Sequence, residues 1–344
     1  MAGARAADQN GRNPEGDNTM KTFAIRAVLA ASLLAPGQAA LAQEAGDYPS
    51  KPVRIVFGFP AGSATDVAAR RVAAKLSAEL GQSFYVENRP GANGNIGGEA
   101  AAKARPDGYT LLAATISEMA INKPTGIRMS YDPAKDFIPV GLLFTSNPVL
   151  VASNASGLET VPQLVARAKA RPGQVNWAAV NAFQQVFVAS FEKAAGVKLN
   201  VVPYKGTAFA MTDVIGGQLD GMVGYPAEAM AHTSAGRAKA LGLGGTQRNA
   251  YMPDTPTLGE LGYADMDLIA WGGLFAPAGT PPAIVDKLNR AIRNANATPD
   301  VREALAKTGS EAKPYTAGQF AAFVRNEISR WDKLVRETGV KIGE

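Results

Sequence analysis

The pattern of apolar and polar positions alternates between short β-branched runs and longer amphipathic stretches. The run Val53–Phe57 is followed by small residues at 58–63 and then by a stretch that carries Val72, Leu76 and Leu80. The spacing of these last three residues places them on one helical stripe, so the segment predicts a strand, a turn and an amphipathic helix. Because the alternation continues along the chain, it predicts an α/β fold with largely parallel sheets.

Further elements follow from the same patterns. We expect strands at Phe84–Glu87, Thr110–Ala113, Val149–Ala152, Val175–Ala178, Val201–Pro203 and Met222–Val223. The chain is expected to return to the first lobe around Leu268–Pro277. We expect helices near Gly98–Ala104, 160–170, Gln185–Ala195, Ala208–Ile215, Pro226–Ser234, Pro281–Asn294, Pro299–Lys307 and Thr316–Thr338. Thr160 and Thr316 each precede a glutamine by three residues, which is capping-box spacing, and Thr280 precedes Pro281 as a candidate N-cap.

The order of these elements predicts two lobes. Residues 43–146 and 270–344 are assigned to the first lobe, and residues 147–269 form an inserted second lobe. Such an insertion makes the chain cross twice between the lobes. Two crossings give a hinge and a cleft in which a small ligand can be enclosed from both sides.

Composition excludes several classes of chemistry. The 344 residues contain no cysteine and a single histidine, His232, so thiol nucleophiles, disulfides and thiolate metal sites are excluded. One histidine also disfavours a zinc cluster or a serine–histidine triad. The formal charge is only +5, and no basic block with interleaved aromatic residues occurs, which disfavours nucleic acid as a partner. We expect no cofactor and no metal.

The N-terminal region has the pattern of a signal peptide over residues 20–42. Lys21 and Arg26 are basic, Ala27–Ala35 is apolar, and Ala40-Leu-Ala42 is a small-residue cleavage site. The polar residues 1–19 are interpreted as a non-native or mis-started extension. The apolar run is too short to span a bilayer. We therefore expect export to the periplasm.

The turn after the first strand is the leading candidate for a binding site. Backbone N–H groups of Ala61–Ala64 lie at a predicted helix N-terminus, where unpartnered amides and the helix dipole favour an anion. Ser63 is expected to contact the ligand, although it also suits a plain turn. Asp66 has an alternative interpretation as the N-cap of the helix.

Five motifs in order support a more specific interpretation. They are Phe59-Pro-Ala-Gly-Ser-Ala-Thr-Asp66, Glu87-Asn-Arg-Pro-Gly-Ala-Asn-Gly94, Pro106-Asp-Gly-Tyr-Thr-Leu-Leu112, Val202-Pro-Tyr-Lys-Gly206 and Phe275-Ala-Pro-Ala-Gly-Thr-Pro-Pro282. Together they resemble the Bug (TctC-like) solute-binding proteins of tripartite tricarboxylate transport systems. The resemblance covers essentially Tyr48–Glu344.

The resemblance implies a periplasmic-binding-protein-like (Venus flytrap) fold and a function without catalysis. Such a protein holds a small carboxylate, an aliphatic dicarboxylate or an aromatic carboxylate, and delivers it to the permease subunits of a membrane transporter. We expect a monomer. By resemblance, the loop of the first lobe contributes ligand contacts from Phe59, Ala61, Gly62, Ser63 and Asp66. We also expect a contact from Ala64 in the same loop. Ala61 stands where the family usually has glycine, so its Cβ can shift the loop or shrink the pocket.

The second lobe departs further from the family pattern. The segment Val180-Asn-Ala-Phe-Gln-Gln185 replaces a small-residue loop that ends in histidine, and Gln185 stands at the usual histidine. Glutamine cannot be cationic, and Phe183 adds an apolar surface. We therefore expect a ligand that is less charged, longer or more aromatic than a short dicarboxylate. The remaining predicted contacts lie near strand ends or in this segment: Thr115, Ser117, Asn181, Gln184, Tyr204, Lys205, Gly206, Thr207 and Tyr225.

Several features have a structural interpretation beside the functional one. Lys205 suits a solvated surface charge, and His232 suits a structural role at a helix end. Trp271 is expected to pack at the hinge, with lining of the cleft as the alternative. Two other functions share the pattern: a ligand sensor that signals to a membrane kinase, and a hydrolase using Ser63. The hydrolase is disfavoured because no Gly-x-Ser-x-Gly elbow surrounds the serine.

Overall fold

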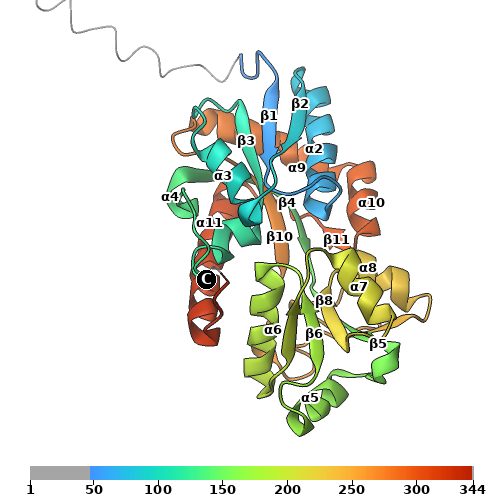
Figure 1. Cartoon of the computed structure of the whole chain (residues 1–344). Coiled ribbons are helices and arrows are strands. Elements are labelled where there is room, and N and C mark those ends of the chain that lie inside the picture. Colours follow the sequence, from blue (N-terminus) through green and yellow to red (C-terminus); the bar gives the residue numbers. More distant parts are fainter. Residues whose placement is uncertain (1–46, 343–344) are drawn as a thin grey trace, which may run out of the picture. The chain divides into compact units, whose positions relative to one another are not determined.

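Two mixed β-sheets organise the chain in the computed structural model, which describes residues 47–342 (Figure 1). The first sheet has the order β11-β4-β10-β3-β1-β2, with β1 at Val53–Phe57, β2 at Phe84–Asn88, β3 at Thr110–Thr115, β4 at Phe137–Ser146, β10 at Ala270–Pro277 and β11 at Ser310–Glu311. The second has the order β7-β6-β8-β5-β9, with β5 at Val149–Ser153, β6 at Asn176–Ala179, β7 at Asn200–Pro203, β8 at Gly221–Gly224 and β9 at Ala238–Leu243. The predicted signal peptide and the preceding extension lie outside the described residues.

Both sheets belong to one compact unit that begins at Tyr48. The chain passes from the first sheet to the second between β4 and β5, and it returns between β9 and β10. The predicted two-lobe α/β fold with two chain crossings is therefore confirmed.

The prediction of largely parallel sheets was wrong. β1 pairs in parallel with β2 and β3, and β6 pairs in parallel with β7 and β8, but β10 runs antiparallel to β3 and β4. β5 is likewise antiparallel to β8 and β9. The crossings explain the difference, because a strand that re-enters the first sheet from the hinge must run against β3.

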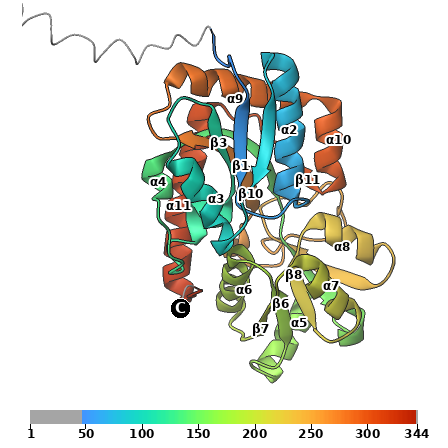
Figure 2. The ribbon, with the colours of Figure 1, turned by 45° about the horizontal axis from the view of Figure 1, so that its top comes forward.

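Helices of two groups cover the two faces of the first sheet (Figures 1 and 2). Successive residues of β1 alternate between the groups: Ile55 and Phe57 pack with α2, α9 and α10, whereas Val56 packs with α3 and α11. This alternation is the period-two pattern of a strand buried on both faces. The bounds are α2 Ala64–Leu80, α3 Asn95–Ala102, α9 Pro282–Ala297, α10 Pro299–Lys307 and α11 Ala317–Thr338.

The second sheet is flanked by shorter helices. Their bounds are α5 Val161–Ala170, α6 Ala182–Ala195, α7 Thr207–Ile215 and α8 Pro226–Thr233, and the short α4 at Pro133–Asp136 belongs to the first lobe. Single turns of 3-10 or π helix are η1 Ala92–Gly94, η2 Ser117–Ile121, η3 Asn154–Ser156 and η4 Ala264–Met266. His232 lies in the last turn of α8, as expected.

The predicted helix starts have mixed outcomes. Thr316 and Gln319 form the full capping box of α11. Thr160 caps α5 as expected, but the side chain of Gln163 accepts the Glu159 N–H at 2.7 Å, one residue earlier than a capping box requires. The predicted Thr280 N-cap was wrong: Pro281 is the N-cap of α9, and Pro282 begins the helix.

Candidate functional site

A cavity of about 660 Å³ lies between the two sheets, at the loops that follow their strands. This volume is within the range of small-molecule sites. Residues of both sheets and of four helix starts line it. Twelve of the predicted contacts are among the lining residues: Phe59, Ala61, Gly62, Ser63, Ala64, Thr115, Ser117, Asn181, Phe183, Gly206, Thr207 and Tyr225.

The turn between β1 and α2 forms one wall. Gly62 has φ +95°, a conformation that glycine adopts without strain. Ser63 is the N-cap, and its Oγ accepts the N–H of Asp66 at 3.3 Å. The N–H groups of Ser63, Ala64 and Thr65 have no acceptor among residues 47–342. They are therefore free to bind a ligand at the positive end of the α2 dipole.

The buried carboxylate of Asp66 stabilises this turn through a hydrogen bond to its backbone. Asp66 is 2% exposed, and its Oδ2 accepts the N–H of Gly62 at 3.0 Å, so this amide is not free for a ligand. Arg70 and Asn88 also donate to the carboxylate, at 2.9 Å each. Burial by itself would raise the pKa of Asp66, but these hydrogen bonds together lower it. The alternative N-cap interpretation of Asp66 was wrong, because Ser63 holds that position.

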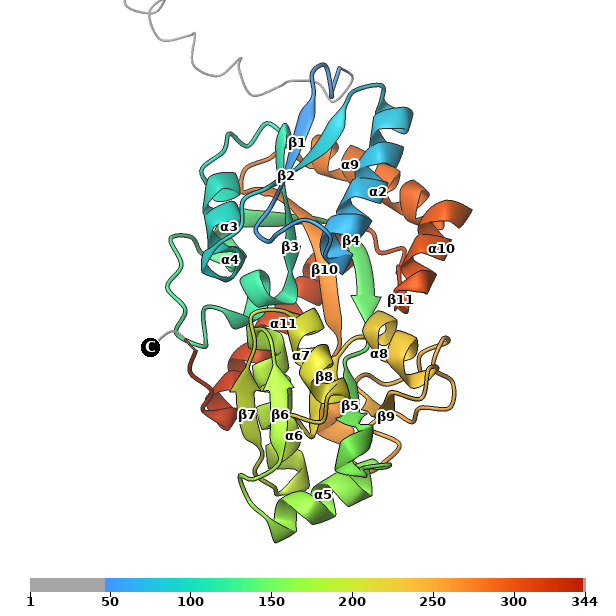
Figure 3. The ribbon, with the colours of Figure 1, turned by 45° about the vertical axis from the view of Figure 1, so that its right-hand side comes forward.

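Three helices of the second lobe begin at the same cavity. Figure 3 shows α7 and α8 next to the N-terminal end of α2. Asn181, Gly206 and Tyr225 are the N-caps of α6, α7 and α8, and all three line the cavity. The α7 start has no side-chain cap, which leaves the N–H groups of residues 207–209 without an intrahelical acceptor.

No cationic side chain of the described residues lines the cavity. Its lining residues include no Lys, Arg or His, and Glu228 is the one carboxyl group among them. The convergent helix N-termini nevertheless create a positive potential, because each carries roughly half an elementary charge. An anion bound here is held by N–H groups and hydroxyls rather than by an ion pair.

Glu228 is the third residue of α8. Its Oε2 accepts the N–H of Tyr225 at 3.2 Å. Burial raises the pKa of Glu228 to about 7, and the hydrogen bond from Tyr225 only partly opposes this rise. The group therefore exchanges between acid and carboxylate near neutral pH.

Aromatic side chains make the remaining walls largely apolar. Phe183 stacks on Tyr225 with ring centroids 6.4 Å apart, and Trp331 of α11 packs behind Phe183 at 5.3 Å. Trp271 of β10 also lines the cavity, although packing at the hinge was the expected role. The indole N–H groups of Trp271 and Trp331 both donate to Glu327, at 2.9 and 3.1 Å, so α11 fixes both rings.

Five predicted contacts lie outside the cavity lining. Gln184 is buried, and its side-chain oxygen accepts the Val180 N–H at 2.6 Å. The hydroxyl of Tyr204 donates to Asp213, and Lys205 is exposed to solvent. Gln185 and Asp66 complete the five. A helix start turns successive side chains in different directions, so only part of each predicted segment reaches the cavity.

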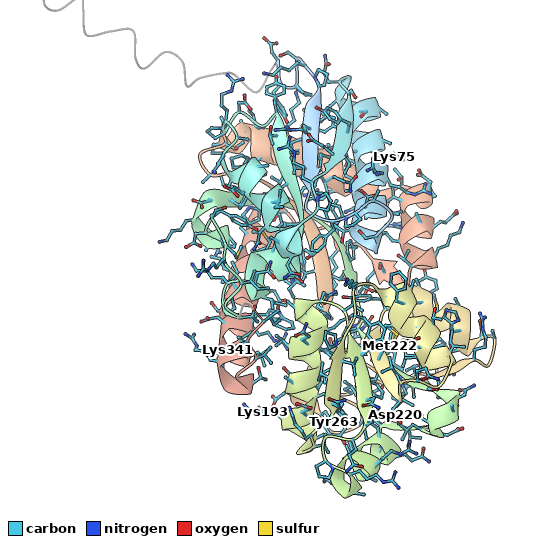
Figure 4. The ribbon with its side chains drawn as sticks, viewed as in Figure 1. Lys75, Lys193, Asp220, Met222, Tyr263 and Lys341 are labelled. Carbon is cyan, nitrogen blue, oxygen red and sulfur yellow. The ribbon has the colours of Figure 1, made fainter. Side chains whose placement is uncertain are left out.

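Gln185 lines a second, more open depression of about 740 Å³ on the flank of α5, α6 and the end of α11. Lysines are frequent there, and Figure 4 labels two of them, Lys193 and Lys341. Lys193 pairs with Glu337 at 2.8 Å, and Lys198 pairs with Glu192 at 2.7 Å. Because these charges are mutually compensated, we place the ligand in the first cavity.

Other lining residues were not predicted. They include Phe144, Ser146, Phe209, Glu228, Thr308 and Ser310. Glu228 could have been found from its place three residues after the N-cap Tyr225, where side chains turn back over a helix start. Thr308 and Ser310 have no local signal, since they reach the cavity only because β11 pairs with the end of β4.

Within residues 47–342, no helix combines the length and the apolar character needed to cross a bilayer. In the same range, no three His, Cys, Asp or Glu side chains gather in an arrangement that could hold a metal ion.

Comparison with known proteins places the chain in a family. Residues 68–340 match the tripartite tricarboxylate transporter family receptor. The chain is 36% identical over 301 residues to the protein BugT of Bordetella pertussis, covering 87% of this chain and 92% of BugT.

Solved structures agree with this match. An R. palustris protein determined with adipate is 29% identical with a TM-score of 0.78, covering 85% of this chain and 99% of that one. MatC of Rhodopseudomonas palustris, determined with bound malate, is 30% identical with a TM-score of 0.75, covering 84% and 100%. The periplasmic binding protein BugD is 30% identical with a TM-score of 0.71, covering 86% and 99%. The chain belongs to the TctC/Bug family of tripartite tricarboxylate transporter receptors, which are periplasmic solute-binding proteins.

Proposed function

We propose that the protein binds a small carboxylate in the cavity between its lobes and delivers it to a tripartite tricarboxylate-type membrane transporter. The observation that carries this proposal is the convergence of four helix N-termini on a cavity without a basic side chain. Two similar proteins were determined with the carboxylates adipate and malate. Residues 20–42 direct the protein to the periplasm in this proposal.

The carboxylate binds first at the start of α2. The free N–H groups of Ser63, Ala64 and Thr65 donate to its oxygens, and the Ser63 hydroxyl adds a further donor. Burying a carboxylate is costly unless hydrogen bonds replace its water, so this number of donors is needed. Hydrogen bonds to an ionised group are the stronger kind.

The second lobe then closes over the bound molecule. The uncapped start of α7 brings further N–H groups, and Phe209 of this helix is 69% exposed in the free protein. Closure is driven by the preference of the ligand for the closed state, because only there do both lobes contact it. A flexible hinge at the two crossings is sufficient for this motion.

Thermal unfolding in the presence of a panel of carboxylates tests the binding step. A ligand at one hundred times its dissociation constant stabilises the folded state by about 2.7 kcal/mol, enough to raise the melting temperature by several degrees. The panel contains aliphatic and aromatic carboxylates and their primary amides as uncharged controls. Stabilisation by a carboxylate but not by its amide is expected, and equal effects of both would contradict the proposal.

Delivery is tested in the source cells. Deletion of the gene is expected to abolish uptake of the radiolabelled carboxylate that the purified protein binds. Unchanged uptake in the deletion strain would contradict the transport part of the proposal while leaving the binding part intact.

A further inference from the structure

One carboxylate oxygen of Glu228 has no hydrogen-bond donor within the described part of the chain. Oε2 accepts the Tyr225 N–H, but Oε1 has no hydrogen-bond partner among residues 47–342. Oε1 of Glu118 also lacks a partner, but that atom is shut away from solvent, whereas Oε1 of Glu228 is not. Because Glu228 lines the cavity, its Oε1 is an acceptor that a bound molecule can reach.

The surroundings of Glu228 determine what this acceptor can receive. Among the described residues, no Lys, Arg or His lines the cavity, so no basic side chain pairs with the carboxylate of Glu228 when it is ionised. A ligand that places a second carboxylate here brings two like charges together in a partly dry site. A ligand that places a hydroxyl or an amine here instead satisfies Oε1 with a hydrogen bond to a charged acceptor.

The aromatic walls of the cavity are suited to an apolar body. Phe59 and Phe144 contribute from the first lobe, and Phe183, Phe209 and Tyr225 contribute from the second. Such walls bind an aromatic ring or an aliphatic chain by removing it from water. The ligand therefore combines a carboxylate with an apolar body.

We propose that Glu228 selects, among carboxylates, those whose apolar body also carries a hydrogen-bond donor, a hydroxyl or an amine. This inference rests on the proposed function, because it assumes that the ligand carboxylate is held at the start of α2. It assigns to Glu228 the role of a specificity-determining residue.

Four six-carbon probes that differ only at the distal end test the inference by titration calorimetry at about pH 9, where Glu228 is ionised. They are hexanoate, 6-hydroxyhexanoate, 6-aminohexanoate and adipate. A donor-bearing probe should bind at least tenfold more tightly than hexanoate, because it alone gains a hydrogen bond to a charged acceptor. Adipate should bind no more tightly than hexanoate. Benzoate, 4-hydroxybenzoate and terephthalate repeat the comparison with an aromatic body.

The variant Glu228→Gln tests the role of Glu228 in ligand selection while keeping the hydrogen bond that stabilises the start of α8. Its amide oxygen still accepts the Tyr225 N–H, so the start of α8 keeps its hydrogen bond. We expect the preference for the donor-bearing probes to fall at least tenfold and the affinity for adipate to rise. Glu159→Gln removes one exposed charge outside the cavity and should leave the ranking unchanged.

Three results would overturn the inference. Adipate could be the tightest of the four probes, the donor-bearing probes could match hexanoate, or Glu228→Gln could leave the ranking unchanged. A failure of every carboxylate to bind is a different result, since it overturns the proposed function itself. Thermal melts of both variants show whether each is folded before the titrations are compared.

Discussion

The backbone N–H of Gly62 donates to Oδ2 of Asp66 at 3.0 Å, across the first turn of α2. This bond ties the loop that follows β1 to the helix that the loop begins. It also orients the neighbouring N–H groups, because Gly62 and Ser63 are adjacent in the chain. Asp66 does not line the cavity, so we expect it to affect ligand binding indirectly, by holding the loop in place.

Replacing Asp66 by asparagine should destabilise the protein and weaken ligand binding together. The buried carboxylate accepts from Gly62, Arg70 and Asn88, and an amide NH2 group would face one of these donors. We expect the free energy of unfolding to fall by about 2 kcal/mol, as for other buried unsatisfied groups. Urea denaturation measures this loss, and an unchanged midpoint would contradict the role given to Asp66.

Ser63→Ala should weaken carboxylate binding about tenfold and lower stability by about 1 kcal/mol, since it removes both a ligand donor and an N-cap. Thr160→Ala is the matched control. Its Oγ1 caps α5 at 3.3 Å, the distance found for Ser63, but it lies outside the cavity. The control should lose similar stability and keep its affinity. If Ser63→Ala and Thr160→Ala bound the ligand with equal affinity, Ser63 would not be a ligand contact.

Phe209→Ala should weaken the binding of carboxylates with an apolar body without reducing stability. The ring is already 69% exposed, so its removal costs the free protein little, but ligand binding buries it. We expect roughly a tenfold loss of affinity for such ligands, which titration calorimetry measures. Tyr251→Ala, at a 49% exposed aromatic outside the cavity, is the control and should change neither property.

Gly309→Ala should displace the start of α8 from the turn before β11. A Cβ on Gly309 would lie 2.2 Å from Cβ of Pro226, the first residue of α8. Gly339→Ala is the control. Gly339 has a φ of +67° and Gly309 a φ of +61°, so alanine is unfavourable at both, but a methyl group on Gly339 would have open space around it. Gly339→Ala should lose about 1 kcal/mol of stability and keep its affinity. Gly309→Ala should lose more stability because of the added clash, and it should lose affinity because α8 lines the cavity. Equal affinities measured by calorimetry would show that this contact does not position the start of α8 for binding.

Glu118 should make stability depend on pH. It is 1% exposed, and burial raises the pKa of Glu118 from 4.5 to about 7, although hydrogen bonds from Thr115 oppose the rise. Between these values the folded state binds more protons than the unfolded state. The contribution of Glu118 to stability is therefore complete below pH 4.5 and is lost as the pH rises through 7.

Glu118→Gln removes this titration and keeps an oxygen for the Thr115 donors. Relative to the variant, the wild-type protein should lose up to about 3 kcal/mol of unfolding free energy between pH 4.5 and 8. Urea denaturation at several pH values measures the difference. A difference that stays constant across this range would contradict the raised pKa of Glu118.

Local signals in the sequence identified the start of the site, and long-range contacts account for what was missed. The strand at Val53–Phe57, its small-residue turn and α2 are adjacent in the chain, so hydrophobic spacing suffices to predict them. β4 was not predicted because Pro139 and Gly141 interrupt its pattern, and it is a strand because it pairs along β10. β9 is rich in alanine and glycine, which are weak strand signals.

The same distinction applies to individual side chains at the cavity. Gln184 and Gln185 stand next to Phe183 in the sequence, yet only Phe183 lines the cavity. Which residue of a helix start faces a ligand depends on how that helix packs, and the chain pattern does not contain this information. Glu228 differs, because its place three residues after the N-cap Tyr225 is a local signal that was overlooked.

A crystal structure of the protein with a bound carboxylate probe tests the central claim most directly. The account predicts carboxylate oxygens within hydrogen-bond distance of the N–H groups of Ser63, Ala64 and Thr65, with no basic side chain in contact. A carboxylate held instead by the lysines of the depression beside α5 and α6, or one turned away from the start of α2, would contradict it.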